Sequence, residues 1–128
     1  TELAEIVGLS PPAVAERVRR LEQRGLIRGY TALLNAQGLG LTMLAFVNVT
    51  LDRPADRPAF LRLVAETPEI QECHHLAGEF DYLLKVCCRD TSQLEYLITE
   101  RLKGLNGVTR TRTVIALSTV KDAVELPL

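Results

Sequence analysis

The sequence predicts an α+β protein in two parts, a small helical unit followed by a larger domain of strands and helices. Two observations support this prediction. The first thirty residues carry two short amphipathic helical patterns separated by a glycine, and the remainder alternates strand and helix patterns in the order β-α-β-β-α-β. The 128 residues suit a small module joined to one moderate domain. We place the helical unit at residues 1–34, a hinge at 35–40 and the second domain at 41–128.

The helical unit contains start and stop signals for its helices. A short apolar stripe over residues 3–7 ends at Gly8, which can enter a left-handed turn without a steric penalty. Ser10 is a favourable N-cap, and Pro11 takes the first helical position, where its missing N–H costs nothing. The second helix is expected to end at Gly25. Its buried face follows from the i, i+4, i+7 spacing of Val14, Val18 and Leu21.

The spacing of three residues joins the two helices into a helix-turn-helix. Ala4, Gly8 and Val14 stand at i, i+4 and i+10, the pattern of two crossing helices with a glycine in the turn. The second helix of such a motif enters the major groove of DNA. The alternative is an ordinary helix pair whose arginines are only solvated. If the unit binds DNA, the residues nearest to bases or phosphates are Ser10, Pro12, Ala13, Arg17 and Arg20.

The charges of the second helix determine what it can bind. Arg17 and Arg20 suit guanine or phosphate, because a planar guanidinium donates two parallel hydrogen bonds. Glu16 disfavours phosphate, so we expect it either to accept a hydrogen bond from cytosine or to pair with Arg20 at i+4. The net charge of -1 neither proves nor excludes nucleic-acid binding, since a few positioned cations suffice.

A helix-turn-helix unit usually includes a further helix that covers its shared apolar face. The sequence starts at Thr1, without Met and directly on the first helix of the motif. We therefore expect a preceding segment that carries this helix. Without it, the unit would be poorly stable and would bind DNA weakly.

The second part of the chain predicts a ferredoxin-like domain. Residues 27–34 predict a linking strand, and the turn-rich stretch 35–40 marks the boundary. Beyond it we expect strands at about 41–51, 70–76, 82–88 and 108–120, with helices at about 58–67 and 91–103. This order gives an antiparallel sheet with two helices on one face. The uncovered face predicts a dimer that forms through the sheets.

No metal site, cofactor or membrane span is predicted. The cysteines Cys73, Cys87 and Cys88 lack metal-site spacing and cannot all pair within one chain, so we expect reduced thiols. The longest apolar run, at residues 41–49, is too short for a bilayer, and no leader sequence opens the chain. These features predict a cytoplasmic protein, associated with the nucleoid if it binds DNA.

Three segments resemble those of Lrp/AsnC (leucine-responsive, feast/famine) transcription regulators. They are the recognition helix and following strand in LSPPAVAERVRRLEQRGLIRGYTALLN, the sensor hairpin in ECHHLAGEFDYLLKV, and the last strand in GVTRTRTVIAL. They occur in the family's order across nearly the whole chain. The resemblance implies a regulator that binds double-stranded DNA and responds to an amino acid or related metabolite. It also implies a homodimer that assembles further, commonly to an octamer.

The resemblance further implies an effector site between dimers. Its residues, matched segment by segment, are His75, Gly78, Asp81, Thr91, Val114, Ile115 and Ala116. In such a site Asp81 would bind the α-ammonium group and Gly78 would offer its N–H to the carboxylate. The residues of the last strand would form an apolar wall. Gly78 and Asp81 are also typical turn residues, so a purely structural role stays open.

Two other functions remain as alternatives. Some relatives of this fold are haem-pathway decarboxylases, but the sequence has no nucleophile elbow, phosphate loop or paired histidine–carboxylate spacing. Proton transfer would fall to His74, His75 or Tyr82, and we predict no catalytic residue. The second alternative is an effector-binding co-regulator that has lost DNA reading. The well-formed helical pattern at residues 10–24 disfavours it, whereas the lack of a further helix before the motif in this sequence favours it.

Overall fold

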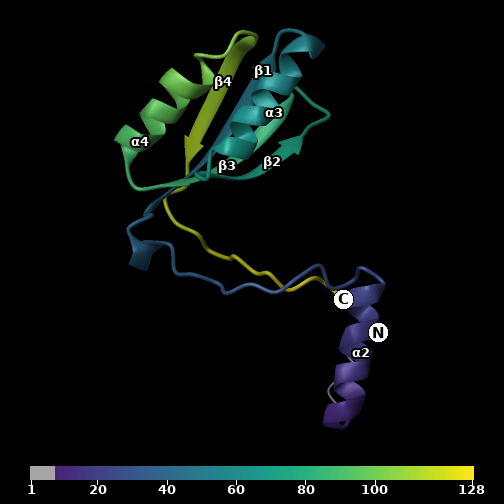
Figure 1. Ribbon diagram of the computed structural model, residues 1–128. Coiled ribbons are helices and arrows are strands. Elements are labelled where there is room, and N and C mark those ends of the chain that lie inside the picture. The colour runs from purple at the N-terminus through teal and green to yellow at the C-terminus, as the bar shows by residue number, and fades with distance from the viewer. Residues whose placement is uncertain (1–7) are drawn as a thin grey trace. The chain divides into compact units, whose positions relative to one another are not determined.

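The computed structural model describes residues 8–128, so the apolar stripe predicted over residues 3–7 lies outside the described residues. Contacts divide the chain into two units, which are described separately (Figure 1). One unit contains the chain up to Leu34 together with Ala123–Leu128, and the other contains Asn35–Asp122. None of the helices in residues 8–128 combines the length and hydrophobicity that a bilayer crossing requires.

The helix α2 (Pro11–Gln23) begins where the capping signals predict. Ser10 precedes it in an extended conformation, with φ -68° and ψ 157°, and Pro11 takes the first position. The Ser10 side chain makes no capping hydrogen bond. Its carbonyl accepts the first helical hydrogen bond, from the Val14 N–H at 2.9 Å. The backbone role of Ser10 is therefore confirmed, and its side chain stays exposed.

The end of α2 is a Schellman turn at Gly25. This glycine has φ +75°, in the left-handed region that disfavours other residues. Its N–H donates to the Glu22 carbonyl at 3.0 Å, and the Leu26 N–H donates to the Leu21 carbonyl at 2.9 Å. This pair of hydrogen bonds satisfies carbonyls that the helix end would otherwise leave unpaired. The predicted stop at Gly25 is confirmed.

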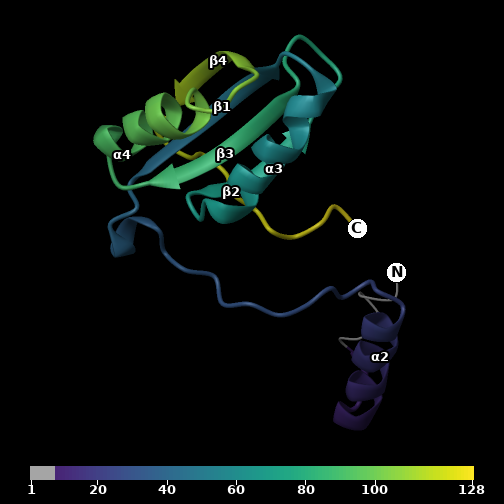
Figure 2. The ribbon, with the colours of Figure 1, turned by 45° about the horizontal axis from the view of Figure 1, so that its top comes forward.

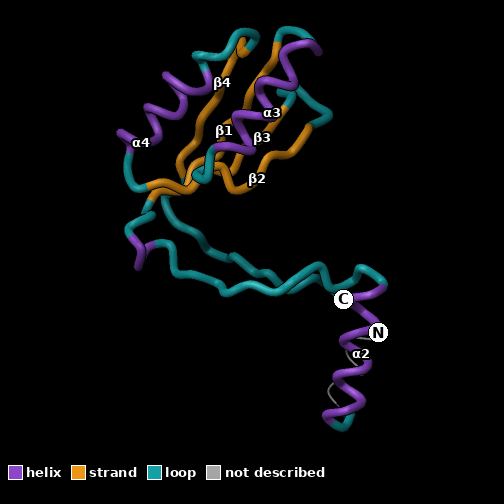
Figure 3. Tube along the Cα trace, viewed as in Figure 1, coloured by secondary structure: helices purple, strands orange, loops and turns teal. Residues whose placement is uncertain are grey.

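The strand predicted over residues 27–34 is wrong. The segment that follows α2 contains no helix or strand before residue 37 (Figure 3). Tyr30, Leu33 and Leu34 have exposed fractions of 74%, 73% and 75%. A strand needs a neighbouring strand to satisfy its backbone N–H and C=O groups, and no described residue supplies one here. The apolar alternation is therefore present without the pairing that would make it a strand.

Residues 35–122 form an antiparallel sheet with two helices on one face (Figures 1 and 2). The strands are β1 (Met43–Leu51), β2 (Ile70–His75), β3 (Tyr82–Cys88) and β4 (Val108–Ile115), paired in the order β2-β3-β1-β4. The helices are α3 (Arg57–Glu66) and α4 (Thr91–Tyr96), and α4 continues as a π-helical stretch, Leu97–Leu102. The predicted ferredoxin-like order βαββαβ is confirmed.

Alternate residues of the two central strands form the core. Ala45, Val47 and Val49 of β1 are fully buried, as are Leu84 and Val86 of β3. The helical residues packed with them are Phe60, Leu63, Leu94, Leu97 and Leu102. This alternation is typical of a sheet with one covered face.

The opposite face of the sheet has no covering element within residues 35–122 (Figure 2). The register places Phe46 of β1 between Lys85 of β3 and Val114 of β4 on this face. Leu83 of β3 lies beside Asn48 of β1 in the same layer. All of these side chains are at least partly exposed, and Val114 is 52% exposed. The uncovered face expected from the element order is present, and it carries Phe46, Leu83 and Val114 together with the polar Lys85 and Asn48.

The last strand is shorter than the predicted range of 108–120. It ends at Ile115, and the next backbone hydrogen bond runs from the Ala116 N–H to the Leu44 carbonyl at 2.9 Å. Because β1 begins at Met43, it offers little further backbone for pairing. Leu117 and Val120 are consequently almost fully exposed.

Candidate functional site

The outward face of α2 lies opposite its apolar side. Leu21 is only 2% exposed, and it defines the buried direction. At about 100° per residue, the opposite direction falls between Arg19 and Glu16, and Arg20 lies beyond Glu16 on the flank of the helix. The Arg19 and Arg20 side chains are 64% and 61% exposed. The helix therefore presents two arginines and one carboxylate to its surroundings.

The predicted DNA-contacting residues divide between two environments. Ser10, Pro12 and Arg20 are exposed, whereas Ala13 and Arg17 are half-buried. Arg17 is closer to the buried side of α2 than Arg20 is, because it precedes Leu21 by four residues, about one helical turn. The sequence prediction omitted Arg19. The helical step from Leu21 would have placed it on the outward face.

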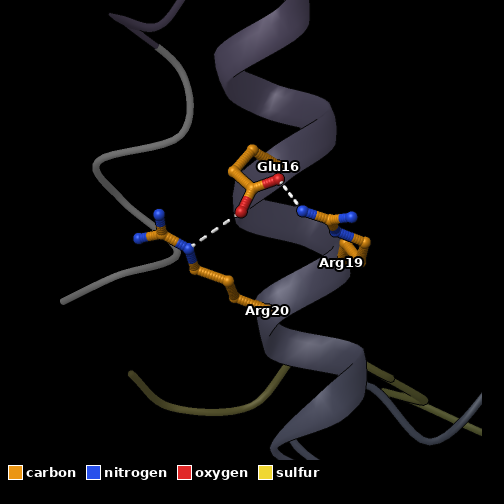
Figure 4. Close-up of polar contacts among 3 residues, drawn as sticks. All are labelled: Glu16, Arg19 and Arg20. Carbon is orange, nitrogen blue, oxygen red and sulfur yellow. Dashed lines mark hydrogen bonds and ion pairs between the residues drawn. The ribbon is translucent and has the colours of Figure 1, made fainter.

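Glu16 binds both neighbouring arginines through separate oxygens (Figure 4). Its Oε2 accepts from Arg19 Nη2, and its Oε1 accepts from Arg20 Nε at 3.2 Å. Burial raises the pKa of the Glu16 carboxyl, but the Arg19 and Arg20 guanidiniums outweigh it and hold that pKa below its ordinary value. The predicted i+4 pair with Arg20 is confirmed, and the i+3 pair with Arg19 adds to it.

The second candidate site starts at the loop between β2 and β3. Asp81 closes this loop, since its carbonyl accepts from the Leu76 N–H at 2.8 Å and its N–H donates to the Val49 carbonyl at 3.0 Å. The side-chain Oδ2 accepts from the Leu51 N–H at 2.8 Å, where the pairing of β1 with β4 shifts register. Among the described residues, the other oxygen, Oδ1, has no hydrogen-bond partner. Asp81 thus supports the loop with one oxygen and keeps one available.

His75 lies beside Asp81 in a shallow groove. Its exposed ring stacks on the ring of Tyr82, with centroids 4.8 Å apart and planes at 16°. The groove has a volume of about 290 Å³ and is also lined by Arg53 and Arg57. The structure therefore brings His75 and Asp81 together, and it adds Arg53, Arg57 and the carboxylate of Asp52, which the sequence prediction did not include.

Gly78 is exposed at the tip of the same loop. Its φ is not positive, and a Cβ added to it would meet no atom within 4 Å. Neither its backbone conformation nor its packing in this chain therefore requires glycine. We predicted either a ligand-binding role or a hairpin-turn role for Gly78. The positive φ that usually makes glycine necessary in a turn is not present here.

Arg110 of β4 holds this loop from the side. Its guanidinium pairs with the Glu79 carboxylate and lies 4.5 Å from the centroid of the Phe80 ring. The hydrogen bond from Arg110 lowers the pKa of Glu79 below its ordinary value. The sequence carried no signal for this contact, because Arg110 is 31 positions from Glu79 along the chain.

The remaining predicted effector residues lie at the other end of the sheet. Ile115 pairs with Ala45, whereas Asp81 donates its N–H to Val49, four residues further along β1. At about 3.3 Å per residue, the two groups are separated by about 13 Å. Thr91, the first residue of α4, follows the end of β3 and is exposed.

The apolar wall also divides between the two faces of the sheet. Val114 shares the uncovered face with Phe46, and Ile115, as the next residue, points to the helix-covered side. The Ala116 side chain, one residue further along, points to the uncovered face again. One protomer therefore does not bring Thr91 or this strand end to the loop that carries Asp81.

Metal binding finds no support in the described part of the chain. No group of three or more His, Cys, Asp or Glu side chains in residues 8–128 is placed to hold a metal ion. His74 pairs instead with Glu72, with His74 Nε2 2.9 Å from Glu72 Oε1. The cysteines are unpaired thiols, and burial raises the pKa values of Cys73 and Cys88.

Comparison with known families matches both units. Residues 44–126 match the Lrp/AsnC ligand binding domain, and residues 1–28 match a winged helix-turn-helix DNA-binding domain. The leucine-responsive regulatory protein of Escherichia coli is 47% identical over 127 residues, which is 98% of this chain and 77% of that protein. The protein of the same name from Salmonella typhimurium has the same identity and coverage.

Solved structures agree with these matches. A transcriptional regulator of Neisseria meningitidis in complex with L-methionine has a TM-score of 0.90 and 32% identity, covering 99% of this chain and 84% of its own. A feast or famine regulatory protein of Mycobacterium tuberculosis, also with L-methionine, has a TM-score of 0.79 and 38% identity, with coverages of 98% and 84%. These are transcription regulators and not enzymes, so the decarboxylase alternative is dropped. The chain belongs to the Lrp/AsnC family of DNA-binding transcription regulators with an amino-acid effector domain.

Proposed function

We propose that this regulator binds an amino acid at the loop Leu76–Asp81, and that binding changes its assembly or its affinity for DNA. The observation that carries the proposal is the available Oδ1 of Asp81, in the same loop as a glycine that the chain itself does not require. A carboxylate oxygen suits the α-ammonium group of an amino acid. The open space at Gly78 suits a close approach of the ligand carboxylate to a backbone N–H.

L-methionine is the first ligand to test. It is the ligand in two of the similar structures, from Neisseria meningitidis and Mycobacterium tuberculosis. Arg57 adds positive charge to the groove, which favours a ligand with a carboxylate. Arg53 also lines the groove but pairs with Asp56, and Asp52 adds a second carboxylate beside Asp81.

The site is completed, on this proposal, by a second protomer. Thr91 and the strand end Val114–Ala116 lie at the other end of the sheet from the loop in one protomer, so they would reach the ligand from a neighbouring one. This arrangement requires at least a homodimer, and we propose, as the Lrp/AsnC resemblance implies, that dimers assemble further to an octamer. His75, which stacks on Tyr82, would line one side of the ligand-binding groove.

The DNA contacts are proposed for the start of α2, for its outward side, and for Arg17 nearer the buried side. Ser10, Pro12 and Ala13 lie at its N-terminal end, which leads into the major groove in helix-turn-helix motifs. Arg17 and Arg20 would contact phosphate or guanine. We propose that the chain is divided into a DNA-binding unit at residues 1–34, a hinge at 35–40, and a domain for effector binding and assembly at 41–128. A regulator of this kind acts on the chromosome, which places it in the cytoplasm with the nucleoid.

Calorimetry with L-methionine, and then with the other amino acids, tests the effector site. Asp81→Asn keeps an oxygen for the Leu51 N–H but removes the charge, so the loop should persist while the ligand ammonium loses its partner. We expect an affinity loss of about 1.5–3 kcal/mol, roughly ten- to a hundredfold. Glu66→Gln, an exposed carboxylate at the end of α3, serves as the control and should bind normally.

Two results would refute the proposed site. One is that no amino acid binds the unaltered protein. The other is that Asp81→Asn binds as tightly as the unaltered protein. A lower melting temperature for Asp81→Asn, without ligand, would instead show that the carboxylate serves chiefly to support the loop.

A further inference from the structure

The carboxylate of Glu16 is shared between two arginines on the outward side of α2 (Figure 4). Each of its oxygens accepts from one guanidinium, Arg19 on Oε2 and Arg20 on Oε1. The Glu16 side chain is 41% exposed, so the cluster lies at the surface, opposite the buried Leu21. One negative charge therefore stands between two positive charges on the face proposed to read DNA.

Both arginines keep hydrogen-bond donors for another partner. Arg19 uses Nη2 and Arg20 uses Nε, and their other N–H groups have no partner among the described residues. A guanidinium has five N–H donors, so phosphate contacts remain available to each. The net charge of the three side chains is nevertheless +1 rather than +2, because Glu16 is ionised. The attraction of this three-residue cluster for phosphate is correspondingly weaker.

We propose that Glu16 determines specificity in this helix by penalising DNA that offers it no base donor. The inference rests on the proposed DNA-reading face of α2. When Arg19 and Arg20 turn to phosphates, the Glu16 carboxylate loses hydrogen bonds and faces the negative backbone. A cytosine in the major groove restores a donor through its N4 amino group. Random DNA, bound through phosphates alone, does not restore it.

The charge-removing variant Glu16→Gln tests this inference. Glutamine keeps the length and an acceptor oxygen but no longer repels phosphate. Binding is measured on random-sequence duplex DNA and on a duplex that the protein itself selects from a random pool. We expect affinity for random DNA to rise about threefold to tenfold, with a salt dependence steeper by about one phosphate contact. The ratio of selected to random affinity should fall at least about fivefold.

The selected sequence provides a second measurement. Replacing cytosines of the selected duplex one at a time should identify a position at which the unaltered protein loses affinity and Glu16→Gln does not. Glu22→Gln is the matched control, since it removes the same charge from an exposed site on the same helix, about 120° around the axis from Glu16, and glutamine keeps an oxygen for the Tyr30 hydroxyl. It should change both affinities by the same factor. Thermal melting of each variant confirms that its fold is retained.

The outcomes separate this inference from the proposed DNA-reading face. Arg20→Ala should weaken binding to both duplexes if that face is correct. If Arg20→Ala weakens binding but Glu16→Gln leaves the specificity ratio unchanged, or lowers both affinities equally, the role assigned to Glu16 is overturned while the face stands. If neither variant alters binding, the face itself is wrong, and the inference is overturned with it.

Discussion

Single residues show how backbone conformation and packing together require glycine. Gly107 has φ +95°, and a Cβ there would lie 2.1 Å from Asp56 Cγ. Asp56 cannot move away cheaply, because it is 9% exposed and its Oδ2 accepts from the Arg53 N–H. We therefore expect Gly107→Ala to lower the free energy of unfolding by about 3 kcal/mol. Denaturant unfolding of the unaltered and variant proteins measures the change.

Gly78→Ala is the matched control for this measurement. Its φ is not positive and its Cβ would meet nothing within 4 Å, so its stability should change by less than about 0.5 kcal/mol. Equal stabilities for the two variants would contradict the role assigned to Gly107. The sequence shows both residues only as glycines. The two variants are expected to differ in stability because a Cβ at Gly107 would meet Asp56, which is distant in sequence. No local sequence pattern predicts this contact.

At the scale of elements, sequence signals correctly predicted the limits of those helices and strands that are determined by neighbouring residues. Ser10, Pro11 and Gly25 bound α2 as expected, and β3 has the predicted limits of Tyr82 and Cys88. The prediction was wrong for the strand at 27–34 and for the end of β4. Strand limits depend on whether a partner strand is present, and an apolar pattern alone does not contain that information.

The turn that ends α2 carries a prediction of its own. At Gly25 a side chain would meet nothing within 4 Å, so only the left-handed φ of +75° requires glycine. We expect Gly25→Ala to destabilise the helical unit by about 1 kcal/mol, and Gly25→Asn by less, since asparagine tolerates this conformation. Helix content from circular dichroism during thermal melting measures both. Equal melting of alanine and asparagine variants would show that the conformation is not the cause.

The predicted effector residues illustrate the limit of a site prediction from one chain. The structure brings His75 and Asp81 into one groove, but it leaves Thr91 and Val114–Ala116 at the other end of the sheet. Residues that lie apart in one protomer can form one site only through assembly. Arg110, which holds the loop through Glu79 and Phe80, escaped prediction because the contact is tertiary.

The whole molecule is expected to associate through the uncovered face of its sheet. Phe46 and Val114 lie side by side there, and Leu83 extends the apolar surface onto β3. Burying such a face against a second copy removes apolar area from water. A charge placed on it would be desolvated in the dimer but would stay wet in the monomer. Phe46→Glu should therefore weaken the dimer without unfolding the protomer.

We expect Phe46→Glu to weaken dimerisation by about 3 kcal/mol or more, at least roughly 150-fold in the dissociation constant. Light scattering at micromolar concentration should give the unaltered protein at least twice the 14.2 kDa chain mass, and the variant a smaller value. Leu61→Glu, at an exposed position on α3 and so on the helix-covered side, is the matched control and should keep the mass of the unaltered protein. A mass of 14.2 kDa for the unaltered protein would refute the dimer. If Leu61→Glu dissociates the assembly and Phe46→Glu does not, the helices rather than the sheet form the interface.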